Sequence, residues 1–164
     1  MKKIIFGLLL ICFSFDAFSL EIPKDYKLQN DNDYKKYEPV ALNCINWLYS
    51  TPINKEKDVR SKAQSFLIQW ISGTNLVSIT MYEKITSPML NNPEVLMIYL
   101  GGCAKYQLEH KKSGFTPEAN FAGTVDAINF YKANKNYLKP SPGLDDYIKR
   151  NDAGTLKNYL NQLF

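Results

Sequence analysis

Histidine, cysteine and glycine-rich motifs are scarce in this sequence, and their scarcity argues against several kinds of active site. His110 is the only histidine among 164 residues, and the three cysteines are Cys12, Cys44 and Cys103. None of them lies at the ligand spacing of a zinc site. The sequence also lacks a serine nucleophile elbow, a phosphate-binding glycine loop and a dinucleotide-binding fingerprint. We therefore expect no metal ion and no cofactor.

Neither charge nor apolar character is concentrated in a long run beyond the N-terminus. The chain has 20 basic and 16 acidic side chains, and its cations occur as scattered pairs. Because a long basic stripe is missing, we expect no nucleic-acid partner. Beyond the N-terminal segment, no stretch approaches the roughly twenty apolar residues that cross a membrane as a helix.

Residues 1–19 have the pattern of a cleaved signal peptide. Two lysines follow the first methionine, Ile4–Phe15 is an apolar run, and Ala17 and Ser19 are the small residues of a cleavage site. The run is short for a membrane anchor, which makes a retained anchor the weaker reading. We expect cleavage between Ser19 and Leu20 and export of the mature chain to the periplasm or the cell exterior.

Loss of Cys12 with the signal peptide would leave Cys44 and Cys103 in the exported chain. An oxidising compartment favours pairing of two such thiols, so we predict a disulfide between them. The alternative is two unpaired, buried thiols that pack as small apolar side chains. Neither is expected to be a nucleophile, because both lie within apolar helical stripes.

Val59–Ile71 is the clearest amphipathic helix. Its apolar side chains recur every three or four positions, while Arg60 and other polar residues fall between them and suit the solvent side. Asn54 is the expected N-cap, and Gly73 stands where a left-handed C-cap belongs. The apolar stripe consists of Val59, Ala63, Phe66, Leu67, Trp70 and Ile71.

Other helical segments complete an all-α prediction. Pro39, Pro93 and Pro117 suit first helical positions, with Asn92 and Thr116 as caps for the last two. The link between the helix that begins at Pro39 and the helix Val59–Ile71 is short, and short links favour antiparallel neighbours. We therefore expect Trp47 and Trp70 to share one core. The expected helices cover about 39–49, 94–110, 117–131, 144–148 and 156–163 in addition to 59–71.

Residues 76–86 are ambiguous, because their apolar residues fit either a strand or a short helix. We predict the helix, since no second strand is available to pair with a strand here. The fold prediction is an irregular single-domain helical bundle of five to seven helices over residues 39–164. A polar N-terminal arm over residues 20–38 precedes it, and we expect this arm to be poorly ordered.

Two features of the helical domain bear on function. Gly101–Gly102 lies inside a helix, where a glycine pair admits a close neighbouring backbone, and we favour this packing role over a ligand cavity. A lysozyme-like glycosidase needs two catalytic carboxylates, and the candidates in this sequence are Glu94, Glu109 and Glu118. Their spacing selects no acid–base pair, and helix capping explains the first and last of them.

Tyrosine is the one compositional excess, with 11 residues. A tyrosine combines an apolar ring with a polar tip, which suits both the rim of a core and a recognition surface. Most of the tyrosines fit the core rim. Tyr26, Tyr34 and Tyr37 lie on the polar arm, and we predict that they form a contact strip for a partner.

The run WLYSTPINKEKDVRSKAQSFLIQWISGT (Trp47–Thr74) resembles a segment of small exported all-helical bacterial proteins of unknown function. The resemblance implies a helical fold and no particular activity. We interpret the chain as a non-catalytic binding module of inhibitor, immunity or envelope-accessory type, whose partner is a protein or an envelope component. The alternatives are a small peptidoglycan glycoside hydrolase and a carrier for a small apolar ligand held near Gly101–Gly102.

Overall fold

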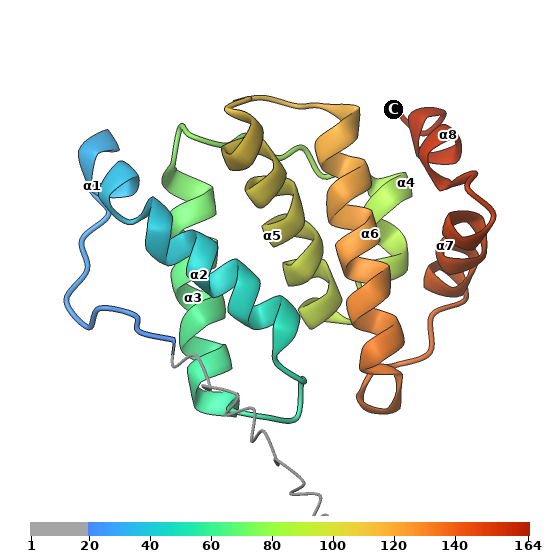
Figure 1. Cartoon of the computed structure of the whole chain (residues 1–164), viewed down its shortest axis with the longest axis horizontal. Helices are drawn as coiled ribbons and strands as arrows, with labels where there is room; N and C mark the ends of the chain where they lie inside the picture. Colours follow the sequence, from blue (N-terminus) through green and yellow to red (C-terminus); the bar gives the residue numbers. More distant parts are fainter. Residues whose placement is uncertain (1–19) are drawn as a thin grey trace, which may run out of the picture.

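The computed structural model describes residues 20–164, and this part of the chain is entirely helical apart from its connections (Figure 1). The all-α prediction is confirmed, but the expected number of helices is too low. The predicted signal peptide, including Ser19, lies outside the described residues. Two short 3-10 helices, Ser87–Met89 and Lys135–Tyr137, accompany eight α-helices. These are α1 (Asp31–Lys36), α2 (Glu38–Ser50), α3 (Lys57–Gly73), α4 (Glu83–Thr86), α5 (Pro93–His110), α6 (Pro117–Ala133), α7 (Pro142–Asp152) and α8 (Leu156–Asn161).

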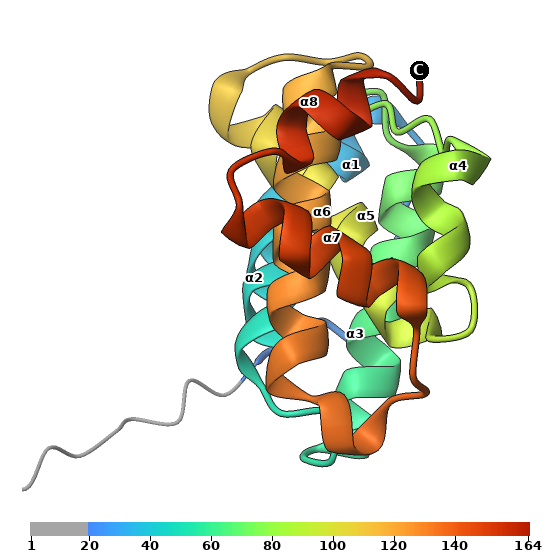
Figure 2. The same cartoon turned by 90° about the vertical axis from the view of Figure 1, so that its right-hand side faces the viewer.

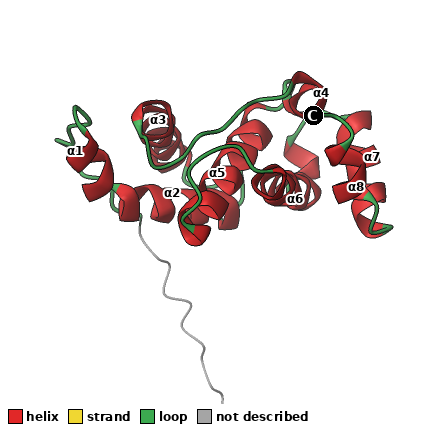
Figure 3. Ribbon diagram, turned by 90° about the horizontal axis from the view of Figure 1, so that it is seen from above, coloured by secondary structure: helices red, strands yellow, loops and turns green. Residues whose placement is uncertain are grey.

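Helix α5 lies at the centre of the molecule. It runs antiparallel to α6 and makes its most extensive contact with that helix, while α2 and α3 pack on its other side (Figure 1, Figure 3). Helices α7 and α8 cover the side of α6 that points away from α5 (Figure 2). Within residues 20–164, no helix combines the length and the apolar character needed to cross a membrane.

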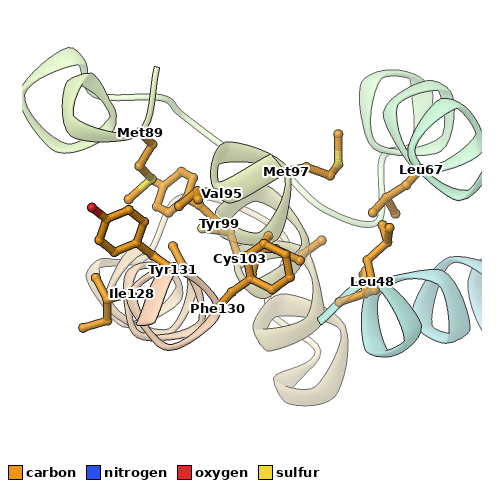
Figure 4. Close-up of a cluster of buried hydrophobic side chains, with 14 of the residues drawn as sticks. Leu48, Leu67, Met89, Val95, Met97, Tyr99, Cys103, Ile128, Phe130 and Tyr131 are labelled. Atoms are coloured by element: carbon orange, nitrogen blue, oxygen red, sulfur yellow. The ribbon is translucent and has the colours of Figure 1, made fainter. Parts of the chain in front are cut away.

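The hydrophobic core extends along both sides of α5. Leu48 of α2 and Leu67 of α3 lie on one side, and Ile128 and Tyr131 of α6 gather with Met89 on the other (Figure 4). All five side chains are buried. A helix placed between two such groups must be apolar around most of its circumference, which explains the nearly continuous apolar run in the first half of α5.

Glycines bring α5 into close contact with its neighbours on both sides. A Cβ atom added to Gly102 would lie 2.8 Å from Cα of Gly123 in α6, and one added to Gly123 would lie 2.5 Å from the backbone oxygen of Tyr99. Gly101 instead faces α2, where an added Cβ would lie 3.2 Å from Cγ2 of Ile45. The predicted packing role of Gly101–Gly102 is therefore confirmed.

The two ends of α3 differ from the prediction. The helix begins at Lys57 rather than after Asn54, whose side-chain amide donates a hydrogen bond to the hydroxyl of Tyr137 at 3.1 Å. Gly73 is the last helical residue and does not have a positive φ. The hydroxyl end of the Tyr34 ring occupies the space where a Cβ of Gly73 would be. This glycine therefore allows the close contact with Tyr34 and does not form a left-handed turn.

Arg60 is buried, with 5% of its surface exposed, although the helical pattern placed it on the solvent side. Its guanidinium donates hydrogen bonds to the backbone oxygens of Leu48 and Thr51 at the C-terminal end of α2. Its Cζ lies 5.6 Å from the ring centroid of Trp47 and 5.8 Å from that of Phe130. Arg60 was wrongly assigned to the solvent side because helical periodicity indicates the face of a helix on which a residue lies and not the groups that its side chain can reach.

Proline and capping signals located the next two long helices correctly. Pro93 and Pro117 are the first residues of α5 and α6, and the hydroxyl of Thr116 accepts a hydrogen bond from a backbone N–H in the first turn of α6. Asn92 makes no such cap. Its side chain instead pairs with both backbone groups of Lys139, at 3.0 and 2.8 Å, and ties the start of α5 to the α6–α7 connection.

The segment that connects α3 to α4 has no regular secondary structure, so the predicted short helix is present only at Glu83–Thr86. Within residues 20–164 no strand pairs with it. The buried amide of Gln107 takes the place of a strand partner, because it accepts from the backbone N–H of Ser78 at 2.8 Å and donates to its oxygen at 2.9 Å. Val77, the residue before Ser78, is buried.

The polar N-terminal arm is ordered in the structure and supplies the additional helix, α1. The side chain of Asn30 caps this helix by accepting from two backbone N–H groups of its first turn. The indole Nε1 of Trp70 donates to the backbone oxygen of Tyr34 at 2.9 Å, which fixes the arm to α3. Trp47 and Trp70 belong to one core, as predicted, with Trp47 beside Arg60 and Trp70 beside the arm.

Candidate functional site

Cys44 and Cys103 are both buried free thiols, so the predicted disulfide is wrong for this structure. A Cβ atom on Gly123 would lie 2.5 Å from Sγ of Cys103, which shows that this sulfur is directed at α6. Cys44 belongs to α2, on the opposite side of α5 (Figure 3). The intervening helix separates the two sulfur atoms, and the thiols pack as small apolar side chains.

We expect these two thiols to react with an alkylating reagent only after unfolding. Burial raises the pKa of Cys44 and of Cys103 to about 12, so almost no thiolate is present near pH 8. Unreduced protein should be modified at both positions in denaturant and at neither under native conditions, as counted by peptide mass spectrometry. Failure to label either cysteine in unreduced, denatured protein would establish a disulfide and contradict the structure.

His110 is exposed at the end of α5 and does not join a metal-binding group. Its ring stacks on Tyr106 with centroids 4.0 Å apart, and its Nδ1 lies 2.8 Å from the backbone oxygen of the same tyrosine. A carbonyl oxygen can only accept, so Nδ1 carries the proton in this contact. Among residues 20–164, no three histidine, cysteine or acidic side chains cluster as metal ligands.

Of the three glutamates considered for a glycosidase, Glu94 lies in the first turn of α5, Glu109 near its end and Glu118 in the first turn of α6. Glu109 faces Lys105 at 3.9 Å and Glu118 faces Lys157 at 3.9 Å, both at the surface. Glu94 is half-buried in the first turn of α5, where it complements the helix dipole. These surroundings provide no buried acid matched with an ionised partner, as a retaining or inverting glycosidase requires.

Asp126 is a carboxylate that the sequence did not single out. It lies between α5 and α6, and burial raises its pKa, with Lys105 opposing this shift and Glu109 adding to it. With Glu118 it lines a shallow surface hollow of about 400 Å³ beside α8. Both residues belong to α6 and are eight positions apart, a separation of about 12 Å along a helix axis. That spacing is long for two carboxyl groups that act on one bond.

Tyr26 and Tyr37 of the arm pack against the core. Their ring centroids lie 4.9 and 6.3 Å from that of Phe66 in an edge-on arrangement, and the Tyr26 hydroxyl accepts from Gln69 at 3.0 Å. The hydroxyl of Tyr34 donates to the backbone oxygen of Leu28 at 3.2 Å. Each of the three tyrosines is half-buried and holds the arm on α3, and their predicted contact with a partner stays a prediction.

The region beside Gly101–Gly102 offers little room for a ligand. The cavity there, between α2, α3 and α5, has a volume of about 10 Å³. One water molecule needs about this much space. The structure therefore gives no support at this position to the carrier hypothesis.

Three aromatic rings from distant parts of the chain meet at the surface. Tyr82 ends the α3–α4 connection, Phe115 lies in the α5–α6 loop, and Phe164 follows α8 (Figure 2). Their ring centroids are 4.9–5.1 Å apart in tilted or edge-on pairs. Phe115 is 37% exposed and Phe164 is 40% exposed. We refer to these three residues as the aromatic cluster.

The surroundings of the aromatic cluster combine apolar and cationic character. Met81, which precedes Tyr82, is 57% exposed. Lys84 lies in α4, two positions after Tyr82, and Lys111 and Lys112 directly follow α5 in the loop that carries Phe115. These three lysines form no ion pair within residues 20–164, and the nearest acidic residues in the chain are Glu83 and Glu109. Exposed aromatic and methionine side chains that gather in one place are typical of protein interfaces.

Comparison with protein-family models, with curated proteins and with solved structures found no match to this chain. The function must therefore be argued from the described surface alone. Sequence reasoning missed the aromatic cluster because its members are separated by 33 and 49 positions (Tyr82, Phe115, Phe164) and share no helical face. A signal was present only in the loop, where Phe115 stands as a large apolar residue between Gly114 and the cap Thr116.

Proposed function

We propose that this protein is a non-catalytic binding module and that the aromatic cluster is its recognition surface. The observation that carries the proposal is the exposure of Phe115 and Phe164, although both are large apolar side chains with ring partners. Buried on binding, two such rings supply the desolvated centre on which interface affinity usually depends. An inhibitory, immunity or envelope-accessory role fits this chemistry.

The proposed partner is a protein whose contact surface is apolar at its centre and acidic at its edge. The apolar centre would cover Phe115 and Phe164, and the acidic edge would face Lys84, Lys111 and Lys112. The rings are already held in place by one another and by Tyr82, so little side-chain entropy is lost on binding. Export to the periplasm or beyond is part of the proposal and places the partner in that compartment.

The test is partner capture with a matched pair of variants. Immobilised protein should retain a stoichiometric partner from an envelope extract of the source cell. The double variant F115S/F164S should lose at least tenfold in affinity for that partner, because both anchoring rings are removed. Tyr49→Ser removes an aromatic ring that is 41% exposed on α2, outside the cluster, and should leave the affinity unchanged.

Two results would contradict this proposal. Equal affinities of the double variant and of Tyr49→Ser would remove the aromatic cluster from the interface. Sustained solubilisation of peptidoglycan by the wild type, abolished by Glu94→Gln or Glu118→Gln, would instead establish the hydrolase. Circular-dichroism melting of every variant distinguishes loss of binding from loss of folding.

A further inference from the structure

A groove of about 500 Å³ lies between the start of the described chain and the outer side of α3. Its apolar lining comes from Leu20, Ile22 and Tyr26 on one side and from Val59 on the other. This volume falls within the range of small-molecule binding sites in proteins. The groove is separate from the aromatic cluster and from the small cavity at Gly101.

The wall formed by the arm is fixed by contacts of its own. The Tyr26 ring meets Phe66 edge-on with centroids 4.9 Å apart, and its hydroxyl accepts from Gln69. Leu20 and Ile22 are half-buried and pack against the core. The groove therefore exists before a ligand arrives, and binding need not pay for ordering the wall.

The polar groups of the groove favour an anion. Lys24 and Lys62 both line it and form no ion pair within the described chain, and Glu21 is the only carboxylate among its lining residues from 20 to 164. Ser61 and Ser65, one turn apart on α3, add two hydroxyl donors. Ammonium and hydroxyl donors together suit a carboxylate, which accepts charge-assisted hydrogen bonds.

We propose that this groove binds a free medium-chain fatty acid. The acyl chain lies along Leu20, Ile22 and Val59, and Lys24 and Lys62 hold the carboxylate. An apolar wall without cations would suit an alcohol or alkane equally well, and cations without the wall would suit inorganic anions. The combination selects a molecule with one apolar chain and one anionic head.

Chain length and head group provide the first test, by calorimetric titration of the purified protein with monomeric ligand. Affinity should increase about fourfold for each methylene from octanoate to decanoate to dodecanoate, because each added CH₂ is buried. Decanoate should bind at least tenfold more tightly than decanol, and decyltrimethylammonium more weakly than both. Equal affinities for the three head groups, or no binding of dodecanoate, would overturn the proposal.

A charge-matched pair of variants provides the second test. The double variant K24E/K62E should reduce the affinity for dodecanoate at least tenfold and leave that for decanol unchanged. The control, K139E/K149E, makes the same change in net charge on the α7 side of the molecule, away from the groove (Figure 1), and should bind dodecanoate as the wild type does. Equal losses of affinity for dodecanoate in both double variants would show that net charge alone causes the effect and would overturn the proposed site.

Two further measurements distinguish the groove from the aromatic cluster and from a membrane-binding surface. The variant F115S/F164S should bind dodecanoate normally, because the aromatic cluster is a separate surface, so failure of either proposal leaves the other standing. Sedimentation with anionic phospholipid vesicles should show no binding. Vesicle binding without binding of monomeric dodecanoate would assign the groove to a membrane surface and overturn the fatty-acid site.

Discussion

Replacing Gly123 with alanine should remove about 3 kcal/mol from the free energy of unfolding, or prevent folding altogether. The new Cβ would lie 2.5 Å from the backbone oxygen of Tyr99 and 2.5 Å from Sγ of Cys103. A backbone oxygen inside a helix cannot turn aside, so α5 and α6 must move apart along their shared contact. Overpacking of this kind costs typically 1–3 kcal/mol and occasionally more, which outweighs the gain of about 1 kcal/mol in helix propensity.

The matched control is Gly101→Ala in the same core. Its Cβ would lie 3.2 Å from Cγ2 of Ile45, and that side chain can adjust by a few tenths of an ångström. We expect the free energy of unfolding to change by no more than about 1 kcal/mol, because the gain in helix propensity offsets the tighter contact. Urea unfolding followed by circular dichroism measures both variants. Equal stabilities would show that α5 and α6 have more freedom to separate than their contact indicates.

The fold class and the long helices were accessible from sequence because their signals are local. Pro93, Pro117 and Thr116 act within one helical turn, so the starts of α5 and α6 were predicted correctly. The nearly continuous apolar run of α5 is likewise a local feature, and it agrees with the central position of this helix. Signals of this kind can be recognised in the sequence without knowing where the other helices lie.

The errors arose where a distant residue decides the outcome. Gly73 has the position of a C-cap glycine, but the Tyr34 ring determines its role. The segment after α3 finds no strand partner in the described part of the chain, and Gln107 supplies hydrogen bonds to Ser78 from 29 positions away. Pairing of Cys44 with Cys103 depended on which side of α5 each thiol faces, and spacing alone does not contain that information.

The candidate site was the least accessible part of the sequence. Tyrosines on a polar arm were expected to face a partner, but Phe66 and Gln69 on α3 provide intramolecular contacts for Tyr26. The exposed rings of Phe115 and Phe164 lie in a loop and after the last helix, where periodicity carries no information. The packing of α8 against α6 and α7, together with contacts of both rings to Tyr82, brings these two rings together.

Arg60→Ala should destabilise the protein by about 3 kcal/mol. The guanidinium is buried between the Trp47 and Phe130 rings, and it is the side-chain donor to the backbone oxygens of Leu48 and Thr51. Removing it leaves a cavity against both rings and two acceptors without their charged donor. These oxygens close the C-terminal end of α2, where a positive charge also complements the helix dipole.

Arg60→Met separates packing from hydrogen bonding, because methionine fills much of the same space without a donor. We expect this variant to lose about 1–2 kcal/mol of its free energy of unfolding, which is less than Arg60→Ala loses. Burial of the charged group has a cost of its own, because the buried Nε of Arg60 makes no hydrogen bond within residues 20–164 and burial lowers the pKa of the guanidinium. Lys62→Ala, an exposed cation two positions away, should change stability by no more than about 0.5 kcal/mol. Chemical denaturation measures the free energy of unfolding of the three variants. If Arg60→Met is as unstable as Arg60→Ala, the whole effect is due to the lost hydrogen bonds. Wild-type stability in Arg60→Ala would instead mean that α2 keeps its C-terminal end without this side chain.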